Sequence, residues 1–351
     1  EEVMGKVLMK GNEAIGEAAI RAGCLNYFAY PITPQSEVAE YLARRLPEAD
    51  GKFLQGESEV AVSYMILGAA ASGERVFTTS SSPGISLMSE GIRYITAAQC
   101  PAVFVNIMRG GPGLGGILPS QADYMQSVKG GGHGDYKLLV MAPASVQEAV
   151  EMMMGAFALA EKYRNPVMIL GDGLIGQMME PVEFPDSLKA EPTNKDAWAT
   201  NGMATRKSNQ RNLVKTLYLD PEALNAHNLM LKAKYEQMER EDVRYEAYNV
   251  DNDYSLLVVS YGTMSRVCRT AIDNLKDQGL EVGMIRPQTL FPFPKTAIYD
   301  AAGKQGCRAV LCVEMSMGQM VEDVERGVAG QLPVHWYGKC GGEVPTPEEV
   351  M

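Results

Sequence analysis

Short apolar runs alternate with helical stretches along the first half of the chain. The runs are rich in β-branched and aromatic residues, and the stretches between them repeat their apolar positions with helical spacing. The predicted strands are residues 25–30, 52–55, 75–79, 101–107, 138–142 and 166–170. Strands of this kind, alternating with helices, predict an open and mostly parallel α/β sheet over a first domain, residues 1–180.

Helix signals support this interpretation. The stretch 145–163 begins with Ser145 as a predicted N-cap, and Glu148 three residues later predicts a capping box.

The pattern breaks between residues 181 and 253. The first part of this region is polar with little periodicity, which predicts an irregular arm. Residues 221–246 then predict one amphipathic helix with Pro221 in its first turn. This helix either braces two domains or binds a partner.

Alternation of apolar runs and helices resumes at residue 254. Strands are predicted within 254–262, 280–290, 308–315 and 332–338, and Thr263 is a candidate cap for the helix after the first of them. We therefore expect a second open α/β domain over residues 254–351.

Composition narrows the classes of function. The chain has 43 acidic and 32 basic residues, a net charge of −11, which argues against nucleic acid or an anionic membrane as partner. The longest uncharged stretches, 22–36 and 94–108, contain proline and are too short to span a bilayer. The N-terminal run lacks the apolar core of a signal peptide. The six cysteines are scattered without a CxxC pair, which favours a reducing, cytoplasmic location and no local metal cage.

Ligands of open α/β sheets bind outside the carboxyl ends of the strands, so the residues after each strand are the candidates for chemistry. After the first strand comes Tyr30-Pro31-Ile32-Thr33-Pro34. Two prolines make this turn rigid and leave one hydroxyl and the backbone of Ile32 and Thr33 to meet a ligand. A plain strand–helix turn is the alternative.

Glu59 follows the second strand and opens a helix that is apolar on nearly every face. A carboxylate there is either a compensating charge for the helix dipole or a functional acid. Glu57 and Ser58 are the ordinary capping candidates, which leaves Glu59 the least explained of the three.

Two further loops complete the candidate site. The hydroxyl-rich loop after the third strand carries Ser82 and Gly84 and lines a pocket or simply caps the next helix through Ser82. After the fourth strand, Arg109 opens a loop dense in glycine, where a guanidinium can grip a carboxylate or phosphate with two parallel hydrogen bonds. This loop is no P-loop, because the GKS/T ending is missing.

The Gly171-Asp172-Gly173 run resembles the start of a thiamine-diphosphate metal motif. That motif needs an asparagine further on, and Asn194 and Asn201 fall in the irregular arm. We expect a turn here and no metal on this chain. With only three histidines, a histidine metal site or a Ser–His–Asp triad also has little support.

Taken together, YPITP, QGESEVAVSYMILGAAASG, FTTSSSPGISLMSEG and RGGPGLGG resemble the 2-oxoacid:ferredoxin oxidoreductases. The resemblance is to the subunit with the pyrimidine-binding domain of thiamine diphosphate, followed by a transketolase C-terminal-like domain. The second half matches only in layout, through SYGTMSR, IRPQTLFPFP and VEMSMGQM.

The resemblance implies roles for the candidate residues. Glu59 matches the glutamate that hydrogen-bonds N1′ of the cofactor's aminopyrimidine, and Thr33 and Arg109 match positions that contact the 2-oxoacid. Pro31, Ile32 and Thr33 in the first turn, with Ser82 and Gly84, are expected to line the cofactor.

The resemblance also implies partners. The diphosphate and Mg²⁺ motif and the [4Fe–4S] cysteines have no match in this chain, so a second, catalytic subunit is expected to carry them. A ferredoxin-like subunit and a coenzyme A-handling subunit complete the expected complex. The implied reaction converts a 2-oxoacid and coenzyme A to acyl-coenzyme A and CO₂, with electrons passed to ferredoxin.

The loop GGPGLGGILPSQADY resembles the branched-chain (2-oxoisovalerate) enzymes more than the 2-oxoglutarate ones. Its Leu114, Ile117 and Leu118 suit an apolar substrate, and it adds no second cation after Arg109. A 2-oxoglutarate enzyme, a non-oxidative thiamine-dependent decarboxylase pair and a non-catalytic scaffold subunit are the alternatives.

Overall fold

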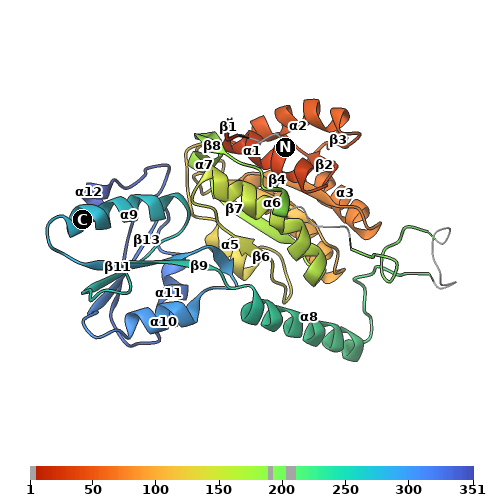
Figure 1. Cartoon of the computed structure of the whole chain (residues 1–351). Helices are drawn as coiled ribbons and strands as arrows, with labels where there is room; N and C mark the ends of the chain where they lie inside the picture. Colours follow the sequence, from red (N-terminus) through yellow and green to blue (C-terminus); the bar gives the residue numbers. More distant parts are fainter. Residues whose placement is uncertain (1–4, 189–192, 203–210) are drawn as a thin grey trace.

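The computed structural model describes residues 5–188, 193–202 and 211–351, which form two α/β units side by side (Figure 1). The first unit is built on a seven-stranded sheet in the order β12-β6-β7-β5-β4-β2-β3. All neighbours pair in parallel except β12, an antiparallel edge strand contributed by the second half of the chain. The strands are β2 (Asn26–Ala29), β3 (Lys52–Gln55), β4 (Val76–Ser80), β5 (Val103–Met108), β6 (Leu139–Met141), β7 (Val167–Asp172) and β12 (Thr289–Phe291).

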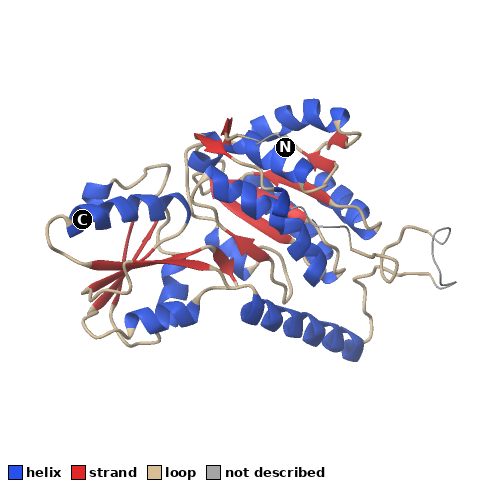
Figure 2. Cartoon of the chain, viewed as in Figure 1, coloured by secondary structure: helices blue, strands red, loops and turns tan. Residues whose placement is uncertain are grey.

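Helices cover both faces of this sheet (Figure 2). Because side chains alternate along a strand, each of the inner strands serves two cores. In β5, Val103 and Val105 pack toward one group of helices and Phe104 toward the other. The first group is α1 (Gly11–Arg21), α2 (Ser36–Glu48) and α6 (Val146–Tyr163); the second is α3 (Glu59–Ala71), α4 (Ser82–Ala97) and α5 (Tyr124–Lys129).

Short elements close the edge near the N-terminus. The strands β1 (Val7–Lys10) and β8 (Met179–Val182) pair antiparallel, α7 (Gly173–Gln177) precedes β8, and a 3₁₀ turn covers Asp186–Leu188.

The second unit is a five-stranded sheet in the order β14-β13-β10-β11-β9. Its strands are β9 (Tyr245–Tyr248), β10 (Leu256–Val259), β11 (Val282–Pro287), β13 (Ala309–Glu314) and β14 (Val334–Gly338), parallel except for β9. Its helices are α9 (Gly262–Lys276), α10 (Lys295–Ala302), α11 (Met320–Val328) and α12 (Pro347–Val350). The predicted class, two open and mostly parallel α/β units, is confirmed.

Three local predictions were wrong. The helix predicted over 221–246 is α8 (Pro221–Glu241), which Asp220 caps, and residues 245–248 form strand β9 instead. Ser145 is the N-cap of α6, but the Glu148 side chain accepts from the Ala144 N–H and pairs with an arginine of the second unit, so no capping box forms. The N-cap of α9 is Tyr261, which places Thr263 inside that helix. The domain boundaries at residues 180 and 254 remain a prediction.

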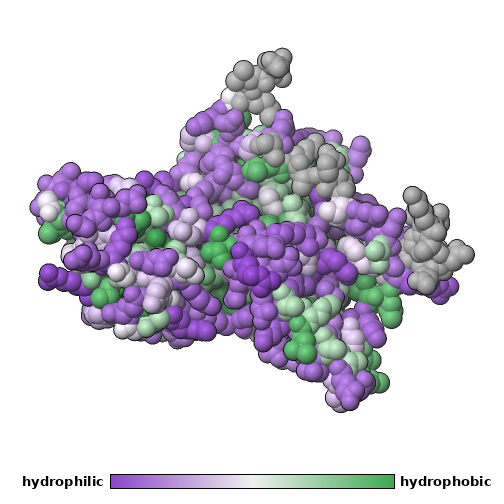
Figure 3. Space-filling view, turned by 60° about the horizontal axis from the view of Figure 1, so that its bottom comes forward, coloured by the Kyte–Doolittle hydropathy of each residue, from purple (hydrophilic) through white to green (hydrophobic). Residues whose placement is uncertain are grey.

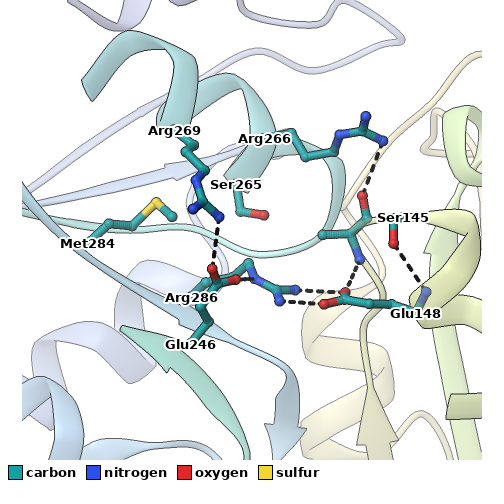
Figure 4. A pocket seen from close by; sticks show the side chains of 9 residues that line it. Ser145, Glu148, Glu246, Ser265, Arg266, Arg269, Met284 and Arg286 are labelled. Carbon is teal, nitrogen blue, oxygen red and sulfur yellow. Dashed lines mark hydrogen bonds and ion pairs between the residues drawn. The ribbon is translucent and has the colours of Figure 1, made fainter. Parts of the chain in front are cut away.

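Ion pairs join the two units around a cavity of about 260 Å³ (Figure 4). Arg286, at the end of β11, donates to Glu148 of α6 at 2.9 Å and to Glu246 of β9 at 2.8 Å. The half-exposed Arg266 and Arg269 of α9 pair with Glu180 and Glu246. Each arginine here has a carboxylate partner. The cavity therefore belongs to the interface between the two units, which we call the joint, and is not a candidate active site.

The helices of the described ranges include none that is both long and apolar enough to cross a membrane.

Candidate active site

The candidate residues meet where β2, β4 and β5 end. The strand order reverses here, because β3 lies on one side of β2 and β4 on the other. Such a switch point leaves a crevice at the carboxyl edge of an open α/β sheet. Thr33 follows β2, Ser82 follows β4, Arg109 follows β5, and Glu59 begins α3.

Glu59 is 6% exposed and lies against Gly84 of the neighbouring helix α4. A Cβ atom on residue 84 would stand 3.0 Å from Glu59 Oε1 and 2.1 Å from the Ser80 hydroxyl oxygen. Only glycine therefore fits at position 84, and the two predicted residues are neighbours. Ser58 is the N-cap of α3 and accepts from the Ala61 N–H, so Glu59 is not needed as the cap.

Two polar groups beside Gly84, the Glu59 carboxylate and the Ser80 hydroxyl, lack hydrogen-bond partners among the described residues. Across the part of the chain that the structure describes, no group donates a hydrogen bond to the Glu59 carboxylate. The Ser80 hydroxyl is fully buried without a partner, whereas the Glu59 carboxylate oxygens still reach solvent. Buried polar groups are normally hydrogen-bonded, so this pair is suited to a ligand that supplies donors.

Arg109 connects two of the predicted loops. Its Nη1 donates to the Thr33 carbonyl at 2.9 Å, and its Nη2 donates to the Leu114 carbonyl at 3.1 Å. The guanidinium is buried, and its Nε has no partner. The structure therefore brings Thr33 and Arg109 together, with one side of the guanidinium still able to donate.

The glycine-dense loop folds back on itself above Arg109. Gly116 N–H donates to the Gly110 carbonyl at 3.0 Å, and Gly115 has a φ of +60°. A Cβ atom at residue 115 would lie 1.8 Å from the Gly110 carbonyl oxygen, so glycine is required there. The loop exposes its apolar side chains: Leu114 (84%), Ile117 (58%) and Leu118 (57%).

Ser82 is not the N-cap of α4, and its predicted contact with the cofactor stays a prediction. The N-cap of α4 is Ser81, and the Ser82 hydroxyl donates to Asp123 Oδ2 at 2.5 Å while it accepts from the Arg109 N–H at 3.0 Å. It therefore fixes the backbone of Arg109.

The turn at Pro31, Ile32 and Thr33 is half-buried to exposed at the mouth of the crevice.

Asp123 is a residue of the site that the sequence reasoning missed. Its carboxylate accepts from Ser82 and from Asn106 Nδ2, the latter at 2.9 Å. Burial raises the pKa of Asp123, and these two hydrogen bonds oppose the rise. The available signal was a single acid directly after an uncharged stretch, residues 110–122.

Asp172 caps a helix. It is buried, and its Oδ1 accepts from the N–H groups of Leu174 at 2.9 Å and Ile175 at 3.2 Å. Asn194 accepts from the Asp196 N–H. Within the described ranges, no three His, Cys, Asp or Glu side chains are grouped to hold a metal ion.

A switch-point crevice with a buried, unpartnered acid, followed by a second parallel α/β unit, is the arrangement of a thiamine-diphosphate-binding enzyme subunit. Residues 17–247 match the family model of the thiamine-diphosphate-binding domain of pyruvate flavodoxin/ferredoxin oxidoreductase. Residues 255–350 match the core domain II of pyruvate:ferredoxin oxidoreductase. The chain belongs to the family of 2-oxoacid:ferredoxin oxidoreductase subunits.

Two relatives from one organism match over nearly their whole length. The chain is 46% identical to the ketoisovalerate oxidoreductase subunit VorB of Methanothermobacter thermautotrophicus, over 99% of this chain and 97% of that protein. It is 36% identical to the 2-oxoglutarate synthase subunit KorA of the same organism, over 98% and 96% of the two chains.

Solved structures agree with this assignment. The 2-oxoglutarate:ferredoxin oxidoreductase of Magnetococcus marinus, with 2-oxoglutarate, coenzyme A and succinyl-CoA bound, aligns with a TM-score of 0.86 at 25% identity. The alignment covers all of this chain and 65% of that one. A split-gene transketolase in an inactive β4 tetramer aligns with a TM-score of 0.60 at 14% identity over 97% and 92% of the two chains, which shows a shared fold. The predicted family and the predicted enzyme class are confirmed.

Proposed function

We propose that this chain binds the pyrimidine end of thiamine diphosphate in a multi-subunit 2-oxoacid:ferredoxin oxidoreductase that acts on branched-chain 2-oxoacids. The proposed reaction converts 2-oxoacid and coenzyme A to acyl-coenzyme A and CO₂, with electrons leaving to ferredoxin. The observation that carries the proposal is Glu59, a side chain 6% exposed that has no hydrogen-bond donor among the described residues and lies against Gly84 beside the unpartnered Ser80 hydroxyl.

The residue types fit the cofactor. In the proposed complex the Glu59 carboxylate accepts a hydrogen bond from the protonated N1′ of the aminopyrimidine and stabilises that charge. The Ser80 hydroxyl supplies a further polar contact, and Pro31 and Ile32 form part of the wall. Thiamine diphosphate, when bound, supplies the electron sink that decarboxylation needs.

Arg109 and Thr33 are proposed to hold the substrate. The unpaired Nε of Arg109, together with the N–H groups not used by Thr33 and Leu114, gives a charge-assisted contact for the carboxylate that all 2-oxoacids share. Ser82 and Asp123 are proposed to keep this guanidinium in place through its backbone.

The site is proposed to be completed by other subunits. A catalytic subunit would supply Mg²⁺, the diphosphate site and a [4Fe–4S] cluster, a ferredoxin-like subunit would carry electrons, and a further subunit would handle coenzyme A. Beside Glu59, helices α3 and α4 expose Val60, Tyr64 and Leu87, an apolar surface that a catalytic subunit would cover. A cytoplasmic location, expected from the scattered cysteines, is part of this proposal.

Two observations support a branched-chain substrate. Identity to the ketoisovalerate oxidoreductase subunit is 46%, against 36% for the 2-oxoglutarate synthase subunit. The loop after Arg109 presents Leu114, Ile117 and Leu118, which suit an apolar side chain better than a second carboxylate.

The test is a comparison on the purified complex. Coenzyme A-dependent reduction of a viologen dye is measured with 2-oxoisovalerate and with 2-oxoglutarate, and kcat/KM is determined for both. We expect a preference of at least about tenfold for 2-oxoisovalerate, since a few methylene groups of pocket fit are worth about 1–3 kcal/mol each. A preference for 2-oxoglutarate would refute the substrate, and activity without coenzyme A or electron acceptor would favour a non-oxidative decarboxylase.

A further inference from the structure

A second cavity, of about 310 Å³, lies at the opposite end of helix α4 from Ser82 and Gly84. It opens between the last residues of α4, the residue that follows α6, two segments of the irregular arm and the first half of α8. Its polar and aromatic lining includes Gln99, Arg164, Trp198, Arg211, Lys215, Tyr218 and His227.

Positive charge in this cavity has no carboxylate opposite it. Arg164, Arg211 and Lys215 line it, and no aspartate or glutamate does. Behind Arg164, the Lys234 ammonium donates to the Arg164 carbonyl at 3.1 Å. Over the described ranges, none of these four cations has a carboxylate within 4.0 Å. In a chain of net charge −11, such a cluster is a local exception that attracts anions.

The half-buried basic groups here also lack a compensating negative charge. Burial lowers the pKa of Arg164, and it lowers the pKa of Lys234 to about 7, with the charge of Arg164 adding to the effect. Burial likewise lowers the pKa of His227, against a hydrogen bond to the Ala97 backbone, and Lys234 lowers it further. An anion in the cavity would reverse these shifts, because an opposite charge favours the protonated forms.

Flat side chains form the other walls. The Arg164 guanidinium lies 4.6 Å from the centre of the Trp198 ring. Tyr218 stacks on His227 with ring centres 4.8 Å apart, and the tyrosine hydroxyl lies 3.3 Å from His227 Nδ1. Aromatic faces and guanidinium groups are the usual contacts of a planar heterocycle.

Backbone conformation points to the same side chains. Gln99 and Arg164 have φ angles of +54° and +46° at the ends of α4 and α6, where glycine is favoured. Arg164 Nε donates to the Gln99 carbonyl at 3.2 Å.

We propose that this cavity binds a small organic phosphate with a planar ring, such as a mononucleotide, with the phosphate on Arg164, Arg211 and Lys215 and the ring beside Trp198 and Tyr218. The site is separate from the thiamine-diphosphate site, since the two lie at opposite ends of α4. Its volume suits a mononucleotide and lies at the lower end of small-molecule sites.

The test is calorimetry on the full chain with AMP, inorganic phosphate and adenosine as probes. We expect AMP to bind at micromolar concentrations, phosphate at least tenfold more weakly, and adenosine more weakly still. Arg211→Gln combined with Lys215→Gln should weaken AMP binding at least tenfold, because it removes two of the three proposed phosphate contacts. Both side chains are exposed on the arm, so the variant should fold. The matched control, Lys232→Gln combined with Arg240→Gln, removes two exposed cations of α8 and should change nothing.

Three results would overturn the proposal. The first is no binding of AMP at millimolar concentration by a chain whose circular dichroism shows it folded. The second is equal weakening in the control variant, which would indicate attraction to net charge alone. The third is AMP binding that disappears when the complex is assembled, which would show that an acidic segment of a partner subunit occupies the cavity.

Discussion

Glu59, which is buried, and Asp123, which is half-buried, are two carboxyl groups of the candidate site whose surroundings differ. Asp123 accepts hydrogen bonds from Ser82 and Asn106, whereas Glu59 accepts none from the described residues. A carboxylate that accepts hydrogen bonds from protein groups holds those groups in place. A carboxylate that accepts none is free to bind a ligand. Sequence reasoning singled out Glu59 because its neighbours explain the helix start. It missed Asp123, since that role depends on contact with a serine 41 positions earlier in the chain.

Glu59→Gln tests the available acid. The variant complex should assemble and bind cofactor, but lose turnover by about 10²-fold or more, because an amide cannot stabilise the protonated ring as a carboxylate does. Viologen-dye reduction and cofactor content are measured on one preparation. Glu57→Gln, an exposed neighbour, is the control and should keep full activity. Near-normal turnover of Glu59→Gln with cofactor bound would contradict the assignment.

Ser82 and Asp123 are expected to act as one unit on Arg109. Ser82→Ala and Asp123→Asn should each raise KM for the 2-oxoacid by about tenfold, with less effect on kcat, because each loosens the backbone that holds the guanidinium. The double variant should be little worse than either single one, since both remove the same connection. Additive effects on KM would show that the two residues act separately.

The predicted strands were found because their signals are local. The run 101–107 is mostly apolar on both faces, as a central parallel strand requires, and the run 75–79 is rich in β-branched and aromatic residues; they became β5 and β4. Strand β9 was missed because its alternating pattern follows directly on a helix, and strand β12 because it leaves the second unit to pair with β6 of the first. A short edge strand is defined by its partner, and the partner is distant in sequence.

Helix α8 provides a pH test through Lys234. Burial and the nearby Arg164 lower the pKa of Lys234 from its ordinary 10.5 to about 7; His227 and Cys100 are its other titratable neighbours. Between pH 7 and 10.5 the unfolded chain therefore holds this proton more tightly than the folded chain, so the free energy of unfolding rises with pH. The slope is at most about 1.4 kcal/mol per pH unit.

The measurement is urea unfolding between about pH 7 and pH 9, with wild type compared with Lys234→Met. The free energy of unfolding of wild type should rise with pH relative to that of Lys234→Met, because the methionine variant has no side-chain proton to release. Lys232→Met, on an exposed turn of the same helix, should follow wild type throughout. Parallel curves for wild type and Lys234→Met would show that Lys234 stays protonated in the folded chain.

The second unit supports the active-site loops from behind. Gln121 N–H donates to the Met315 carbonyl at 2.9 Å, and Gln121 Nε2 donates to the Tyr261 carbonyl at 2.9 Å. The apolar core continues from Phe104 of the first sheet to Leu257 of the second. Figure 3 shows apolar side chains on the outer surface around α8 and the segment before it, where Leu213, Leu217, Leu219 and Leu229 are exposed. The chain is thus closely joined inside and leaves apolar surface for other subunits outside.

The joint itself predicts how the chain responds to acid. Burial raises the pKa of Glu148, but the hydrogen bonds and charge of Arg286 outweigh it, and the net pKa is lowered from 4.5. The stability this pair contributes is therefore fully present above about pH 4.5 and is lost as the pH falls through the folded-state pKa. Glu148→Gln should lower the free energy of unfolding by about 2 kcal/mol at neutral pH, the value of a hydrogen bond to a charged group.

That difference between wild type and Glu148→Gln should shrink as the pH falls below 4.5, because Glu148 is protonated in the unfolded chain before it is protonated in the folded chain. Glu151→Gln, an exposed position one turn further along α6, is the matched control and should cost far less at any pH. Urea unfolding from about pH 7 to pH 3.5 measures all three proteins. A difference that stays constant across this range would mean that Glu148 contributes through packing and not through its charge, and the joint would then tolerate any side chain of similar shape.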